Sequence, residues 1–273
     1  MYCGGIRKPN SLRGDDMSAL HKAFVEYKKL AHPPIFESVL HIRCDLHNLL
    51  PNSTDSLSAL SQVLSEFDVK HTGQIWEARL SPEKAQAEKA LVGERFASDD
   101  GKHVVQVFPN GVAVSLLRPY PDWSEFSGYA INCWEALVDA AGAILNVERI
   151  GLRAINKIEL PKGPGSIDSL FGEGSPQGLI SHCTGKLQRQ GFLFCESVRD
   201  TERDVQANIT RTMQPPTIDS HGNPILLYDI DAFTFPGKEI GKEGVLQEVE
   251  KLHEFRNEIF FSEMSKCALE SFS

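Results

Sequence analysis

The side chains best suited to chemistry lie in the segment 146–160, where charged and apolar residues alternate. Successive side chains of a β-strand point to opposite faces, so a strand here places Arg149, Arg153 and Lys157 on one face. The other face carries apolar residues and one amide: Ile150, Leu152, Ala154, Asn156 and Ile158. Because buried cations cost free energy unless negative groups meet them, the row predicts anionic partners.

A pair of aspartates offers one set of partners. A strand over residues 225–235 would place Asp229 and Asp231 on the same face, since they are two residues apart. Lying across from Arg149 and Arg153, they would form cross-strand ion pairs. We favour this structural ladder as the interpretation of the cation row.

Two functional interpretations remain beside the ladder. The first is a site for a nucleotide, a phosphorylated ligand or an acidic peptide, because arginine forks bind oxyanions well. Its residues would be Arg149, Arg153, Lys157 and Asn156. The second is a metal or acid–base pair made by the two aspartates, but no third ligand with matching spacing accompanies them.

Other motifs carry weaker signals. His41, Cys44 and His47 have a metal-like spacing, but a strand would turn Cys44 away from both histidines and leave a tetrahedral zinc site open. The chain has no Gly-x-Ser-x-Gly, Walker or dinucleotide-binding glycine pattern. We therefore expect no catalytic residues, no metal and no cofactor.

An aromatic cluster opens the clearest helical segment. Tyr120, Trp123 and Phe126 could form a base-stacking platform, but aromatic residues at a helix start more often anchor the helix on a sheet. Asp122 and Glu125 have the spacing of a capping box, which marks the helix start. We predict that the cluster packs the helix against the core.

Composition narrows the functional classes. The chain has 273 residues and a net charge of −9, which disfavours a general nucleic-acid binder. No apolar run approaches the roughly 20 residues that span a bilayer, and the N-terminus lacks an apolar signal core. Six scattered cysteines are typical of reduced thiols. We expect a cytoplasmic protein that does not contact membranes.

The hydrophobic pattern predicts an α+β fold, mainly antiparallel sheet packed against two long helices. We expect a disordered tail and a helix in residues 1–31, followed by two α+β units, 32–145 and 146–273. Each unit reads strand, helix, strands and long helix, which suggests a duplication with one shared core. Residues 82–89 are expected to form a loop or helical turn, and 243–272 one long helix.

Several motifs together resemble a known family. They are Pro33-Pro34-Ile35 with Glu37, Trp76, the Tyr120 cluster, Arg149-Ile-Gly-Leu-Arg153 with Asn156, and Asp229-x-Asp231. The combination, over residues 33–265, is similar to a family of sporadically distributed, uncharacterised prokaryotic proteins. At position 154 this chain has Ala where that family often has an aromatic residue. The resemblance implies no agreed activity, and patchy occurrence suits an accessory or defence-associated role.

These observations favour a non-catalytic cytoplasmic binding protein that acts through a protein partner or as a homodimer. The absence of catalytic motifs and the apolar stripe of the C-terminal helix support this hypothesis. One alternative is a sensor of an anionic small molecule or nucleotide, with a pocket lined by Arg149, Arg153 and Asn156. Another is a partner-dependent hydrolase or nuclease using Asp229 and Asp231.

Overall fold

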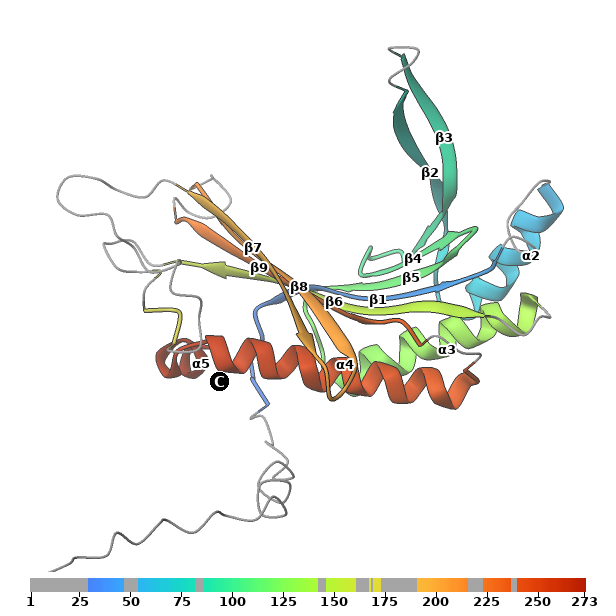
Figure 1. The fold of residues 1–273 in the computed structure, drawn as a ribbon. Coiled ribbons are helices and arrows are strands. Elements are labelled where there is room, and N and C mark those ends of the chain that lie inside the picture. The colour runs from blue at the N-terminus through green and yellow to red at the C-terminus, as the bar shows by residue number, and fades with distance from the viewer. Residues whose placement is uncertain are drawn as a thin grey trace, which may run out of the picture.

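The protein has an α+β architecture built on one nine-stranded antiparallel sheet (Figure 1). The computed structural model describes residues 29–46, 54–81, 86–141, 146–160, 167, 169–172, 191–215, 223–236 and 240–273. The predicted tail and nearly all of the predicted first helix lie outside these ranges.

The strand order separates the strands of the first half of the chain from those of the second half at the middle of the sheet. The strands are β1 (Ile35–Cys44), β2 (Lys70–Ser81), β3 (Gln86–Ala97), β4 (His103–Phe108), β5 (Gly111–Leu117), β6 (Val147–Glu159), β7 (Phe192–Asp200), β8 (Val205–Gln214) and β9 (Ile225–Thr234). They run in the order β2-β3-β4-β5-β1-β6-β9-β8-β7, and all neighbours are antiparallel. On each side of the central β1–β6 pair, the next strand is the last strand of that half of the chain.

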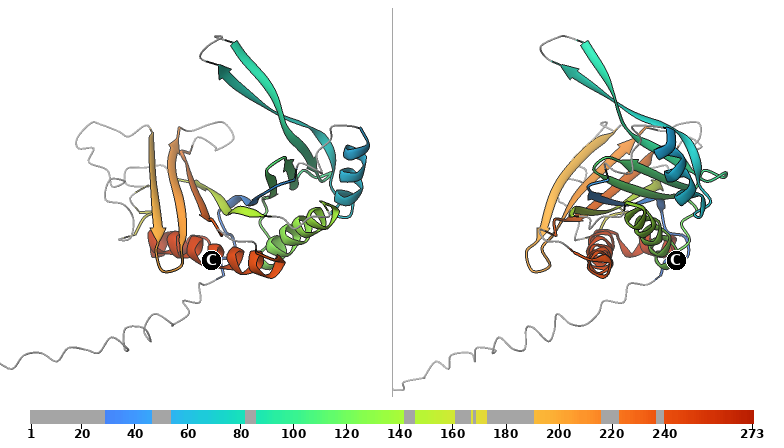
Figure 2. Two further views of the ribbon diagram at one scale, coloured as in Figure 1. Left: turned by 45° about the vertical axis from the view of Figure 1, so that its right-hand side comes forward. Right: turned by 90° about the vertical axis from the view of Figure 1, so that its right-hand side faces the viewer.

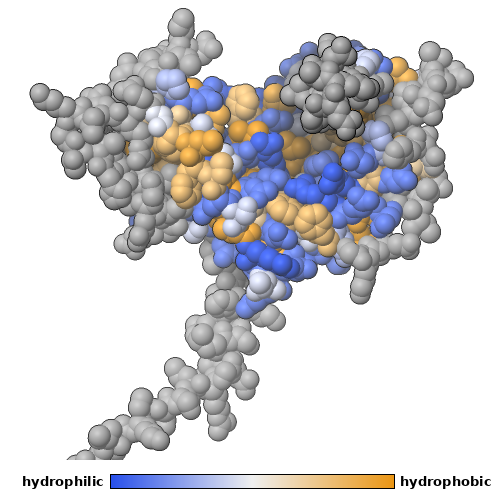
Figure 3. Space-filling model, turned by 45° about the horizontal axis from the view of Figure 1, so that its top comes forward, coloured by the Kyte–Doolittle hydropathy of each residue, from blue (hydrophilic) through white to orange (hydrophobic). Residues whose placement is uncertain are grey.

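Helices cover one face of this sheet. The described helices are α2 (Thr54–Ser65), α3 (Trp123–Ala141), α4 (Lys242–Glu263) and α5 (Lys266–Ser271). The α4 helix packs against β6, β8 and β9, and α3 packs against β5 (Figure 2). The opposite face is more polar: Figure 3 shows hydrophilic side chains over its middle, with smaller hydrophobic patches beside them.

The alternating burial of β1 shows how the sequence sets these faces. Ser38, Leu40, Ile42 and Cys44 are buried on the helix side, whereas the intervening residues are more exposed. Burial of one face and solvation of the other is the usual consequence of period-two patterning in an antiparallel strand. The same alternation in β6 places its cations on the open face.

The prediction of a loop at residues 82–89 was wrong in part, because β3 already begins at Gln86. Its backbone pairs with β2 from Gln86 opposite Ser81 to Ala97 opposite Lys70. This two-stranded arm projects from the body of the protein (Figure 1). Backbone hydrogen bonds to β2 hold residues 86–89 in a strand although their sequence is largely polar.

The single C-terminal helix predicted for residues 243–272 was also wrong, because the chain leaves the helical conformation at Met264. Ser265 begins α5, and its hydroxyl accepts a hydrogen bond from the Ala268 amide at 3.1 Å. Serine is a preferred N-cap residue, so Ser265 starts α5 rather than continuing α4. Within the described ranges, no helix has the length and apolar character needed to cross a membrane.

Candidate functional site

The predicted ladder of ion pairs is present on the open face. Arg153 donates to both carboxylate oxygens of Asp229, at 2.8 and 2.6 Å. Arg149 donates to Asp231 at 2.9 Å. Both pairs are offset along the strands, since the residue directly opposite Arg153 is Asp231. Carboxylates of the same chain therefore already meet both arginines.

Gly151 makes room for one of these pairs. A Cβ at this position would lie 2.3 Å from the Nη1 atom of Arg149, so the guanidinium passes directly over the glycine. It continues over the ring of Phe233, at 4.6 Å from the centroid, to reach Asp231. Burial raises the pKa of Asp231, and Arg149 opposes that shift.

The other two residues of the predicted anion site lie apart. The Nζ atom of Lys157 is 5.7 Å from the centroid of the Phe36 ring. Asn156 is buried on the helix side and donates to the Tyr228 carbonyl at 3.0 Å. The expected pocket lined by Arg149, Arg153 and Asn156 is therefore wrong, because strand alternation turns Asn156 to the opposite face.

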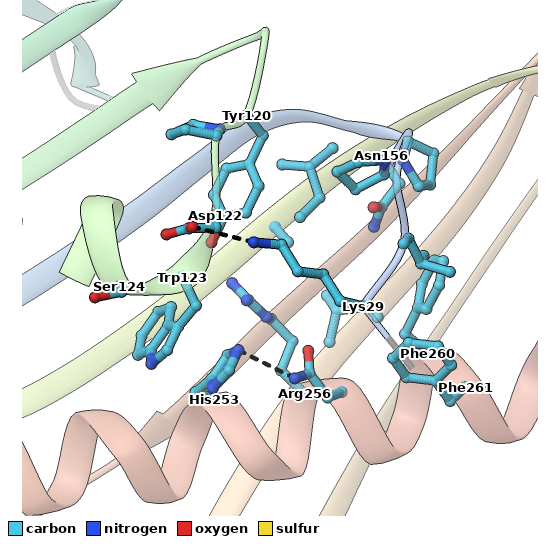
Figure 4. A pocket seen from close by; sticks show the side chains of 18 residues that line it. Lys29, Tyr120, Asp122, Trp123, Ser124, Asn156, His253, Arg256, Phe260 and Phe261 are labelled. Carbon is cyan, nitrogen blue, oxygen red and sulfur yellow. Dashed lines mark hydrogen bonds and ion pairs between the residues drawn. The ribbon is translucent and has the colours of Figure 1, made fainter. Parts of the chain in front are cut away.

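A cavity of about 420 Å³ lies on the helix side of the sheet. Residues from the segment before β1, the start of α3, the middle of the sheet and α4 surround it (Figure 4). Its lining is mainly apolar and aromatic, and Asn156 belongs to it. Small-molecule sites in proteins span roughly 300–1,000 Å³, so the volume suits a small ligand.

Arg256 of α4 is the most unusual residue of this cavity. Its side chain is buried, with the residue 3% exposed, yet no carboxylate in the part of the chain that the structure describes pairs with it. Its contacts are a long hydrogen bond of 3.4 Å to the Ser38 hydroxyl and the Trp123 ring, 5.8 Å away. Burial lowers the pKa of Arg256, and the nearby Tyr120 hydroxyl partly offsets that effect.

An aromatic wall stands beside this arginine. The rings of Trp123 and His253 stack at 3.8 Å with an angle of 6° between their planes. Trp123 donates its ring N–H to Glu250 at 3.0 Å, and His253 is hydrogen-bonded to Asn257 at 3.0 Å. Burial and the charge of Arg256 lower the pKa of His253 to about 3. The histidine is therefore neutral at pH 7.

An ion pair lies at the rim of the cavity. Lys29 donates to Asp122 at 3.2 Å, and Figure 4 shows its side chain reaching across to α3. The other oxygen of Asp122 accepts from the Glu125 amide at 2.9 Å, which confirms Asp122 as the cap of α3. Lys29 is thus already neutralised, so Arg256 is the cation of the cavity that lacks a carboxylate among the described residues.

Sequence reasoning found only part of this site. It placed the Tyr120 cluster at a helix start, and Phe126 is buried in the core as predicted. It did not predict that Tyr120 and Trp123 line a cavity. It also missed Arg256, although a charged residue at helical spacing from Leu252 and Phe260 interrupts an apolar stripe and could have been a signal.

The zinc interpretation gains no support from the geometry. His41 lies on the open face beside Arg149 and Arg43, and burial together with these charges lowers its pKa to about 4. Cys44 is buried on the other face, and burial raises its pKa to about 11. His47 lies outside the described residues. Over the described ranges, no group of three or more His, Cys, Asp or Glu residues is placed to hold a metal.

Comparison with known proteins does not identify the site. No protein-family model matches the chain, and no curated protein does either. The resemblance over residues 33–265 stays a prediction.

Proposed function

We propose that the protein is a non-catalytic receptor for a small anionic molecule, which binds in the cavity beside Arg256. The single observation that carries this proposal is a buried guanidinium that faces a cavity and has no carboxylate partner among the described residues. Removing a charge from water costs several kcal/mol unless an opposite charge and hydrogen bonds offset the loss. A bound anion supplies both. The scattered cysteines predict a cytoplasmic protein, so we place this function in the cytoplasm.

The proposed anion site beside Arg256 differs from the site of the sensor hypothesis, which was expected at Arg149 and Arg153. Arg149 and Arg153 are engaged by Asp231 and Asp229, so an anion would have to displace the carboxylates that neutralise them. Arg256 needs no such exchange. The same ion pairs weigh against a hydrolase or nuclease site, because both aspartates are held by arginines rather than poised around an open position.

A second candidate function is recognition of a protein partner or of a second copy of the chain. The apolar stripe of the C-terminal helix does not favour it, because Val245, Val249 and Leu252 are buried against the chain's own sheet. The projecting arm does favour it, since Trp76 of β2 is 55% exposed. Exposed tryptophans are enriched in the centres of protein interfaces.

The arm can be tested separately from the cavity. Light scattering after size-exclusion chromatography should show an assembly in the wild type that Trp76→Ala disrupts and Arg256→Met preserves. A strict monomer that also captures no partner from native lysate would remove this second candidate.

The duplication predicted from the sequence is part of the same proposal. The strand order supports it, because β1 and β6 occupy equivalent central places and β5 and β9 flank them. The α3 and α4 helices each follow these flanking strands. The cavity lies where the start of α3 meets α4, between the two halves.

The proposed receptor function is tested by thermal unfolding with a panel of anions: phosphate, AMP, benzoate and octanoate. At least one should raise the Tm of the wild type, since ligand at about 100 times its Kd stabilises by about 2.7 kcal/mol. The shift should persist in Arg153→Met and disappear in Arg256→Met. No shift with any anion, or a shift that survives Arg256→Met, would contradict the proposal.

A further inference from the structure

We infer that the cavity selects a monocarboxylate carried on an apolar body, and that it rejects nucleotides and other phosphorylated ligands. This inference rests on the proposed receptor function and names the class of its ligand. It follows from three properties of the cavity, which are the number of its charges, the character of its walls and the state of its rim.

The charge count favours a single negative group. Among the described lining residues, Arg256 is the buried cation, and the second cation, Lys29, is engaged by Asp122 at the rim. Neutral His253 adds no charge at pH 7. A phosphate monoester carries about −1.5 to −2 near neutral pH, so one arginine would leave it partly uncompensated. A carboxylate carries one charge and fits the planar fork of a guanidinium.

The walls favour an apolar body. Tyr120, Trp123, Phe260 and Phe261 present aromatic rings, and Pro33, Pro34, Ile35 and Ile230 add aliphatic surface. The polar groups of Trp123 and His253 are occupied by Glu250 and Asn257. A ribose would lose the water around its hydroxyl groups there, and the Tyr120 hydroxyl alone cannot pair with all of them, so the hydroxyls left buried without hydrogen-bond partners are costly.

At the rim, one carboxylate and one cation neutralise each other. Asp122 is exposed at the mouth and lies 3.2 Å from Lys29. A second negative group of a ligand would find no free cation among the described residues of this rim, because Asp122 already engages Lys29. A ligand with one carboxylate can place it on Arg256 and leave only apolar atoms near the mouth.

The inference is tested by calorimetric titration of the full chain with carboxylates of three body shapes: benzoate, 2-naphthoate and octanoate. Each is matched by its neutral amide, and 2-naphthyl phosphate and AMP represent the phosphorylated class. At least one carboxylate should bind the wild type tenfold or more tightly than its amide. Arg256→Met should reduce that preference to less than threefold, and Arg153→Met should leave it unchanged.

The outcomes separate the ligand class from the receptor function. If 2-naphthyl phosphate or AMP binds more tightly than every carboxylate and depends on Arg256, the receptor function stands and the monocarboxylate inference is overturned. If none of the three carboxylates binds better than its amide, the inference is overturned. If, in addition, no anion shows dependence on Arg256, the receptor function is overturned with it.

Discussion

In the part of the chain that the structure describes, two arginines are buried between α4 and the sheet, and they differ in the groups that neutralise their charge. Arg211 of β8 has no exposed surface, and both oxygens of Glu263 and a carboxylate oxygen of Glu196, at 2.6 Å, meet it. Arg256, less than two helical turns before Glu263, has among the described residues the Ser38 hydroxyl, the nearby Tyr120 hydroxyl and the Trp123 ring, but no carboxylate. The first arginine is part of the fold, whereas the second faces a cavity and has no carboxylate partner among the described residues.

This difference separates stability from function. A buried cation with two carboxylates ties α4 to β8, and removal of one partner leaves charge uncompensated in the core. A buried cation without a carboxylate costs the fold free energy, so its presence calls for a functional reason. The same substitution at the two arginines should therefore change stability in opposite directions.

The largest expected effect is that of Arg211→Met. The substitution strands the carboxylates of Glu263 and Glu196, and breaking a buried pair costs about 3–5 kcal/mol. Urea unfolding at pH 7 should show this loss in the free energy of unfolding. Glu258→Gln is the control. Glu258 lies on α4, like Glu263, but it is exposed and pairs with Arg203, so its substitution should change the free energy of unfolding by less than about 1 kcal/mol.

Next in size is Arg256→Met without ligand. It replaces a buried cation, which no carboxylate of the described ranges neutralises, by an apolar side chain, and replacing buried charge by apolar groups can stabilise by about 1–4 kcal/mol. The free energy of unfolding should rise, in contrast to Arg211→Met. A loss of several kcal/mol would show that Arg256 stabilises the fold and would remove the argument for a ligand.

The third prediction concerns pH. The pKa of His253 is about 3 in the folded chain, below its ordinary 6.5, because of burial and Arg256. Between these values the unfolded chain binds a proton that the folded chain does not, so the free energy of unfolding falls as the pH falls.

From pH 7 to pH 5 the His253 contribution is roughly 2 kcal/mol. His253→Phe keeps a flat ring beside Trp123 and removes the titrating group, so the variant should lose less stability over this range. Urea unfolding at the two pH values measures the difference. An equal loss in both proteins would show that His253 is accessible to protons in the folded chain.

The smallest effect is expected on the open face. Arg153 is 46% exposed at its side chain, and exposed ion pairs contribute about 0–1 kcal/mol. Arg153→Met should therefore cost less than about 1 kcal/mol. Gly151→Ala should cost about as much, because the added Cβ displaces Arg149 from Asp231. The double variant Gly151→Ala, Arg149→Met should lose little more stability than either single variant if both act through the Arg149–Asp231 pair.

The contrast between the two faces also explains what the sequence could predict. Alternation in residues 146–160 predicts which side chains share a face, and two aspartates with the same period predict the ladder. Local spacing likewise predicts Asp122 as a cap. Each of these features depends on a repeat that is visible within a few residues.

The cavity depends on contacts that no local repeat encodes. Trp123 and His253 are 130 residues apart in the chain and meet only because α3 and α4 lie on the same face. That no carboxylate of the described residues pairs with Arg256 is a property of everything packed around it. Its position within the apolar stripe of α4 is a local signal of burial but does not reveal whether an acidic partner is near.

The most direct test of the account is the Arg256 Nε–H resonance in protein labelled with ¹⁵N-arginine, assigned by its loss in Arg256→Met. On titration with the tightest-binding carboxylate of the panel, this resonance should shift and saturate at the calorimetric Kd, while the Arg153 resonance stays in place. A shift at Arg153 with none at Arg256 would contradict the account and return the site to the open face.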